Sequence, residues 1–221
     1  PPKSFWSNFE RMEGLVTYFH LFAYFFVLTS VFKKSDWRIF LSLFVISSIY
    51  ENTYAFLQRI EILPAIQGGP SRVDGTIGNP TYLAAYLIFI LGFCVVLWLD
   101  SQKRWQKYFY GIMAVWVLVT IYFTASRGPT LALLIGSFAA ILLYVFLKPS
   151  LATYDKLVKK AAVAVLILLI LIPGSLWLLR DSALVKNNLS LSRLTSLSLK
   201  ERTIASRFTI WSMSFEGFKE H

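Results

Sequence analysis

The sequence predicts an all-α membrane protein, a polytopic bundle of about six transmembrane helices. Hydrophobic residues make up 56% of the 221 residues, charged residues only 15%, and the mean hydropathy is +0.58. A soluble domain carries about 25% charged residues, so this composition is too apolar for a core that folds in water. The apolar residues also gather into long runs separated by short basic segments, which is typical of membrane helices and their loops.

Six segments approach the roughly 20 apolar residues that a helix needs to cross the ~30 Å hydrocarbon core. They are the segments 15–32, 37–57, 80–99, 108–124, 129–147 and 161–179. The second is the most polar, because Glu51 and its neighbours lie in its final third. The sixth contains Pro173, where we expect a kink that neighbouring helices can tolerate.

The remainder of the chain, 180–221, is predicted to be extracytoplasmic. Within it, the segment 203–219 repeats apolar residues at 4-3-4-3 spacing. This spacing predicts an amphipathic helix that lies on the membrane surface or docks on the bundle. We treat 1–221 as a single transmembrane domain, and we expect it to be a piece of a longer protein because it starts at Pro1 and stops within this pattern.

The net charge of +10 comes largely from short loops, a distribution typical of membrane topology and lipid headgroups rather than of nucleic-acid binding. Ten Lys and Arg residues follow the first, third and fifth predicted helices, and five lie before the first and after the second and fourth. Short cytoplasmic loops are enriched in Lys and Arg, so the ten-residue set predicts the cytoplasmic side. The opposite loops, and the long tail, then face outward.

Two predicted helices begin on this outer face. The first begins at Asn79-Pro80, typical of an N-cap followed by proline at the first helical position. Gly78 lets the chain turn sharply ahead of it, and Arg72 lies in the same loop.

The second outer helix start repeats this construction. Ser126 and Arg127 precede Gly128-Pro129, where we expect the proline to open the helix. A helix N-terminus presents free N–H groups and about half a positive charge. Two such ends beside two arginines therefore predict a pocket for a lipid phosphate or diphosphate. The alternative is that these arginines only reach lipid headgroups.

Other polar residues carry weaker predictions. Glu51 lies near the outer end of its helix, where a costly carboxylate is expected to face the bundle interior. It would either orient an arginine or contact a sugar hydroxyl. Arg207 on the amphipathic segment is, by its position alone, a solvated or headgroup-bound residue. The sequence contains no carboxylate cluster typical of a metal site, so an enzyme of this kind is expected to work without metal or cofactor.

Three stretches then resemble a known family. "RVDGTIGNPTYLAAYL", "TASRGPTLAL" and "SRFTIWSMSFEGFKEH" resemble, in order, the three signatures of the O-antigen ligase and O-antigen polymerase superfamily. "SFWSNFERMEGL" near the start resembles the segment that precedes an early membrane helix in that family. The resemblance extends over nearly the whole chain with compatible spacing.

The resemblance implies a fold of the membrane glycosyltransferase type in the bacterial inner membrane. Members transfer a glycan from undecaprenyl diphosphate to lipid A–core, to a growing polysaccharide or to a protein. The transfer takes place on the outer face, inverts the anomeric centre and needs no metal or cofactor. A different class stays open, a transporter or lipid-binding protein whose outward anion pocket performs no chemistry.

The resemblance also implies residue roles. Arg127 and Arg207 would lie near the donor diphosphate, and Arg72 would contribute from the neighbouring loop. The residues expected to shape the site are Gly78, Asn79, Pro80, Ser126, Gly128 and Glu51. The family's catalytic histidine lies in a periplasmic loop downstream of the last signature, so it is expected beyond residue 221, and His221 is not assigned that role.

Overall fold

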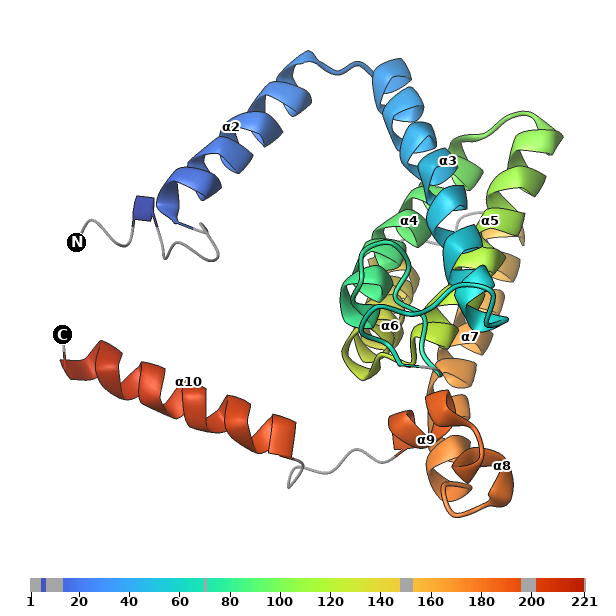
Figure 1. The fold of residues 1–221 in the computed structure, drawn as a ribbon. Helices are drawn as coiled ribbons and strands as arrows, with labels where there is room; N and C mark the ends of the chain where they lie inside the picture. Colours follow the sequence, from blue (N-terminus) through green and yellow to red (C-terminus); the bar gives the residue numbers. More distant parts are fainter. Residues whose placement is uncertain (1–4, 7–13, 70, 148–152, 196–201, 221) are drawn as a thin grey trace.

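The structure is a computed structural model that describes residues 5–6, 14–69, 71–147, 153–195 and 202–220 (Figure 1). His221 lies outside these residues. All regular structure in the described part is helical, which confirms the all-α prediction. The helices are α2 Leu15–Val31, α3 Lys34–Arg59, α4 Pro80–Asp100, α5 Arg104–Thr124, α6 Arg127–Leu147, α7 Thr153–Leu178, α8 Ala183–Lys186, α9 Leu189–Thr195 and α10 Arg202–Glu220.

Four of the described helices, α3 to α6, are long and apolar enough to cross a membrane. This finding supports a multi-pass membrane protein. The first and sixth predicted spans are also helical, but their apolar parts, Leu15–Val31 and Ala162–Leu178, are shorter. At about 1.5 Å per residue, 17 residues extend roughly 26 Å, somewhat less than the ~30 Å hydrocarbon core. Six spans therefore stay a prediction, of which four are supported.

Several helices begin before the predicted positions. Helix α3 begins at Lys34 rather than at residue 37, because Asp36 accepts a hydrogen bond from the Lys33 backbone N–H at 2.9 Å and caps the helix. Helix α5 begins at Arg104 rather than 108, and α7 at Thr153 rather than 161. Lys, Arg and Gln are good helix formers, so these helices extend past the apolar run that hydropathy detects.

Helix α4 lies at the centre of the bundle and packs on α5, α3 and α6 (Figure 1). Its buried side chains recur every three or four residues, so they form one face of the helix. They include Leu83, Leu87, Ile90, Cys94 and Leu97. The facing side of α5 buries Tyr110, Met113, Val117 and Ile121. The buried side chains of α4 and α5 together form one continuous apolar core.

Ion pairs join the start of α3 to the end of α4 at one end of the bundle. Asp100 at the end of α4 accepts a hydrogen bond from Arg38 Nε at 2.9 Å and pairs with Lys34 Nζ, also at 2.9 Å. These contacts hold the loops after α2 and α4 together at one end. The loop 60–79 lies at the other end, where the Val73 N–H donates to the carbonyl of Phe123 at 3.3 Å. The loops after α2 and α4 thus lie at one end and the loop 60–79 at the other. Residues 148–152, in the third loop of the predicted basic set, lie outside the described residues, and the side that is cytoplasmic stays a prediction.

Helices α2 and α10 extend away from the bundle (Figure 1). Helix α2 buries none of its residues. Helix α10 confirms the helical part of the amphipathic prediction, and its apolar side chains Phe208, Trp211, Phe215 and Phe218 are all exposed. In this structure α10 is therefore not docked on the bundle, and its place on a membrane surface stays a prediction.

A buried polar clamp holds the loop 60–79 against the end of α3. The Asp74 carboxylate accepts hydrogen bonds from Gln58 Nε2 at 2.7 Å and from the backbone N–H groups of Gln67 and Gly68 at 2.6 and 3.0 Å. Gln58 Oε1 accepts in turn from the backbone N–H groups of Asp74 and Gly75 at 3.1 and 2.9 Å. Both side chains are buried, so they fix the conformation of the loop around Asp74.

Replacing Asp74 by alanine should destabilise the fold. The change removes the shared acceptor of the buried Gln58 amide and of two part-buried backbone N–H groups, which costs about 1–3 kcal/mol. We expect a lower Tm for Asp74→Ala in detergent solution, measured by intrinsic fluorescence. Asp181→Ala is the matched control, because that side chain is 79% exposed and its ion pairs lie at the surface. Equal Tm values for the two variants would contradict the clamp.

Topology can be measured by thiol labelling. In intact cells, a membrane-impermeant maleimide should label Ile77→Cys from outside, whereas Arg104→Cys should react only after the membrane is opened. Both positions are exposed, and the native Cys94 is buried and gives little background. The unsubstituted chain is the control, and the reverse labelling order would overturn the predicted orientation.

Candidate anion-binding site

The start of α4 confirms the predicted cap. Asn79 Oδ1 accepts from the backbone N–H groups of Thr81 and Tyr82 at 2.9 and 3.4 Å, and Pro80 is the first helical residue. Gly78 precedes the cap with φ +74°, a left-handed conformation that favours glycine. The chain therefore turns sharply, and the N-terminus of α4 lies at the end of the bundle that carries the loop 60–79.

Glu51 supports this turn directly. Its carboxylate accepts from the Thr76 backbone N–H at 3.1 Å and from the Thr76 hydroxyl. A Cβ at Gly75 would lie 2.6 Å from Glu51 Oε2, so this close approach requires glycine. The hydrogen bonds described for Glu51 thus go to the loop rather than to an arginine, and its role here is to position the residues ahead of α4.

Arg72 links the loop before α4 to the turn between α5 and α6. Its Nε donates to the Thr124 carbonyl at 2.9 Å, and its Nη2 donates to Ser126 Oγ at 3.1 Å. Thr124 ends α5 and Ser126 precedes α6. The pairing of these two segments, inferred from two separate sequence motifs, is therefore present in the structure.

Helix α6 begins earlier than predicted. Arg127 is its first residue and Pro129 its third, so the expectation that Pro129 opens the helix is wrong by two residues. Proline is tolerated there because the first N–H groups of a helix have no intrahelical acceptor. The Thr130 hydroxyl donates to the Ser126 carbonyl at 2.8 Å and secures this first turn. Arg127 is therefore held in the first turn of α6, half-buried, with Gly128 exposed beside it.

The tail segment supplies a further arginine that the sequence did not single out. Ser190 Oγ donates to the Tyr122 carbonyl at 2.8 Å, and Tyr122 Oη donates to Asn188 Oδ1 at 2.8 Å. These bonds dock α9 on the end of α5. Arg193 on α9 has a buried Nε atom without a hydrogen-bond partner among the residues that the structure describes.

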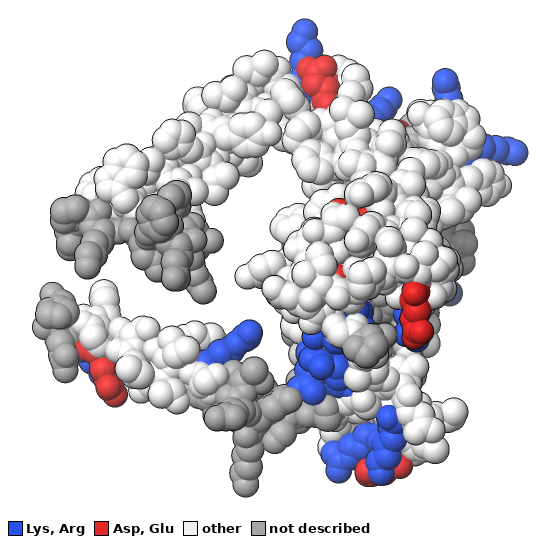
Figure 2. Space-filling view, viewed as in Figure 1, with Lys and Arg blue, Asp and Glu red and all other residues white. Residues whose placement is uncertain are grey.

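Arg72 and Arg193 influence each other electrostatically. Burial lowers the pKa of Arg72 from its usual value, the charge of Arg193 lowers it further, and Asp74 opposes both. In the described part of the chain neither arginine forms a salt bridge. Figure 2 shows Lys and Arg gathered between the lower end of the bundle and α8–α9. Such a cluster suits an anion, and guanidinium groups match phosphate oxygens.

Arg207 is not part of this cluster. It is exposed on α10, which lies apart from the α5–α6 turn (Figure 1). The structure thus brings together Arg72 and Ser126, places Arg127 next to them in the chain, and adds Arg193. The only sequence signal for Arg193 was a basic residue within a Ser- and Leu-rich segment without a clean span, which is too weak to identify a site.

The residues of the site, rather than a relative of known function, indicate what it can bind. No family model, curated protein or solved structure matches this chain. In the described ranges no three His, Cys, Asp or Glu side chains gather closely enough to hold a metal ion. The arrangement offers guanidinium groups, a hydroxyl and a helix N-terminus at one end of an apolar bundle, and these groups together suit a phosphate carried by a lipid.

Proposed function

We propose that this chain is the membrane part of a transferase that moves a glycan from undecaprenyl diphosphate to an acceptor on the outer face of the bacterial inner membrane. The acceptor would be lipid A–core, a growing polysaccharide or a protein. The resemblance of three sequence signatures motivates the proposal. The observation that carries it is the contact of Arg72 with the α5–α6 turn, because this contact joins two of those signatures in space.

The proposed roles follow from how each arginine is used. Two nitrogens of Arg72 already donate within the protein, so Arg72 positions the turn that carries Arg127. Arg127 in the first turn of α6 then faces the donor diphosphate together with the helix N-terminus. Arg193 adds charge from α9. Arg207 would join this group only if α10 moved toward the bundle, and its role stays a prediction from the resemblance.

The chemistry needs charge stabilisation above all. When the bond between the anomeric carbon and the diphosphate oxygen breaks, negative charge develops on the leaving group. The acceptor oxygen bonds to that carbon from the opposite side, and its proton passes to a base. Guanidinium groups placed at the developing charge lower the barrier. The family resemblance assigns the role of this base to a histidine.

Loss of Arg127 should abolish transfer without preventing insertion. Removing one group that stabilises developing charge costs on the order of 10²–10³ in rate, so we expect that loss for Arg127→Ala in the full-length protein. The measurement is glycan transfer in membranes supplied with lipid-linked donor. The control Arg180→Ala removes an exposed arginine that stacks on Trp177. Full activity of Arg127→Ala at normal expression would contradict the proposal.

Arg193 gives a second, independent measurement. We expect Arg193→Ala to lower the rate of transfer and Arg193→Lys to restore part of it, since lysine keeps the charge but loses the bidentate fork. Lys186→Ala is the matched control because Lys186 lies in the same tail segment, 60% exposed and paired with Asp181. Binding of the lipid donor without any transfer by the complete wild-type protein would favour the lipid-binding or transport alternative instead.

A further inference from the structure

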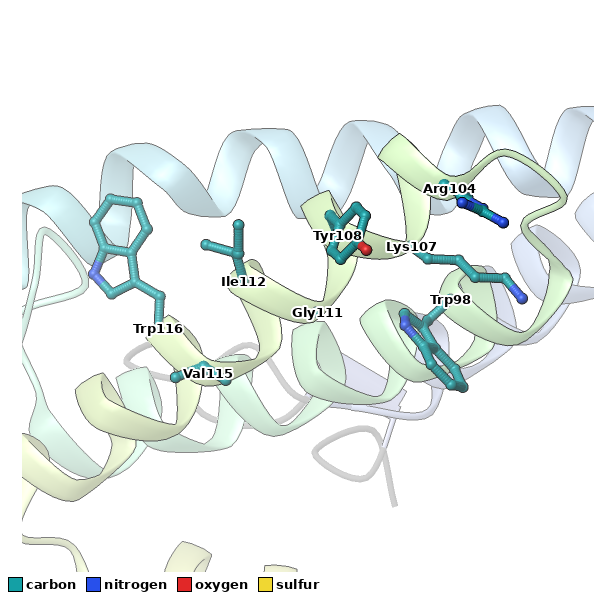
Figure 3. Close-up of a pocket in the computed structure, with 8 residues that line it drawn as sticks. All are labelled: Trp98, Arg104, Lys107, Tyr108, Gly111, Ile112, Val115 and Trp116. Atoms are coloured by element: carbon teal, nitrogen blue, oxygen red, sulfur yellow. The ribbon is translucent and has the colours of Figure 1, made fainter. Parts of the chain in front are cut away.

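A second concave surface lies at the opposite end of the bundle from the arginine cluster. It is a groove of about 870 Å³ between α4 and α5 (Figure 3). Trp98 enters it from α4, and the other lining residues belong to α5: Arg104, Lys107, Tyr108, Gly111, Ile112, Val115 and Trp116. Most of these side chains are exposed, so the groove opens on the outside of the bundle, where lipid surrounds a membrane protein.

The groove is polar at one end and apolar along its length. Arg104, Lys107 and Trp98 gather at one end of it, and Trp116 lies at the other (Figure 3). Lys107 Nζ lies 5.5 Å from the centre of the Trp98 ring, a cation–π distance. Gly111 forms part of the floor, and a Cβ placed there would first meet Trp98 Nε1 at 4.0 Å. The absence of a side chain at this position keeps the groove open.

Among the described residues, no carboxylate balances the charge at the polar end of the groove. The nearby carboxylate of Asp100 is already paired with Lys34 and Arg38. Within the described residues neither Arg104 nor Lys107 forms a salt bridge. Two cations beside an apolar groove are therefore complementary to a ligand that carries an anionic group on an apolar chain.

The dimensions agree with one leaflet of a bilayer. Arg104 and Trp116 are twelve residues apart on α5, roughly 18 Å at about 1.5 Å per residue. Half of the ~30 Å hydrocarbon core is about 15 Å. An acyl chain whose headgroup lies at Arg104 would thus reach the level of Trp116.

We propose that this groove binds an anionic phospholipid. Its phosphate lies between Arg104 and Lys107, where basic side chains at a helix end attract anionic headgroups. One acyl chain follows the surface formed by Gly111, Ile112 and Val115 toward Trp116. The proposal depends neither on the glycan transfer proposed above nor on which leaflet this end of the bundle faces.

The test is native mass spectrometry of the full chain released from mild detergent with added phosphatidylglycerol or phosphatidylcholine. We expect bound phosphatidylglycerol to exceed bound phosphatidylcholine. The double variant Arg104→Gln/Lys107→Gln should weaken phosphatidylglycerol binding on the order of tenfold. Its control is Lys33→Gln/Lys103→Gln, which removes the same charge from the same end but outside the groove. Equal binding of the two lipids, or an equal loss in the control, would overturn the proposal.

A second pair of variants tests the apolar part. Gly111→Leu fills the groove, leaves both cations in place and should also lower phosphatidylglycerol binding on the order of tenfold. Gly92→Leu is the control, because Gly92 lies exposed on α4 with open space around it. Unchanged binding in Gly111→Leu would show that the groove is not the site. A dimer that only Gly111→Leu disrupts, without preference for phosphatidylglycerol, would instead identify a second copy of this chain as the occupant.

Discussion

The guanidinium group of Arg72 is the central contact at one end of this bundle. It bonds the loop before α4 to the carbonyl that ends α5 and to the serine that precedes α6. Beside it the Val73 N–H donates to the Phe123 carbonyl, so backbone as well as side chain joins this loop to the end of α5. The contact depends on the conformation of the loop, which the buried pair Gln58 and Asp74 fixes from the end of α3. A polar clamp inside the loop thus determines where a cation meets the bundle.

This arrangement concentrates positive charge where it is costly. Arg72 is partly buried, and the charge of Arg193 acts on it unfavourably. A protein tolerates two such cations more easily when an anion lies between them, because attraction between opposite charges is strongest away from water. The docking of α9 by Ser190 and Asn188 keeps Arg193 near this position. The electrostatics therefore agree with a ligand that carries concentrated negative charge, as a diphosphate does.

The sequence predicts the helical class and four of the spans because apolar length is a strong signal in a membrane. It also predicts the cap at Asn79, since that cap depends on neighbouring residues alone. It does not predict the first turn of α6, because proline is compatible with several positions there. Arg193 and the partners of Glu51 could not be predicted, since both depend on tertiary contacts between segments far apart in the chain.

The two ends of the bundle use similar side chains in different settings. At the end that carries the loop 60–79, Arg72 donates to the Thr124 carbonyl, so its position is fixed. At the other end, Arg104 and Lys107 are exposed on α5, beside the apolar groove. A fixed cation favours selective recognition of a reacting group, because positioning entropy is already lost before binding. Exposed cations beside an apolar groove suit a lipid that must exchange with the bilayer.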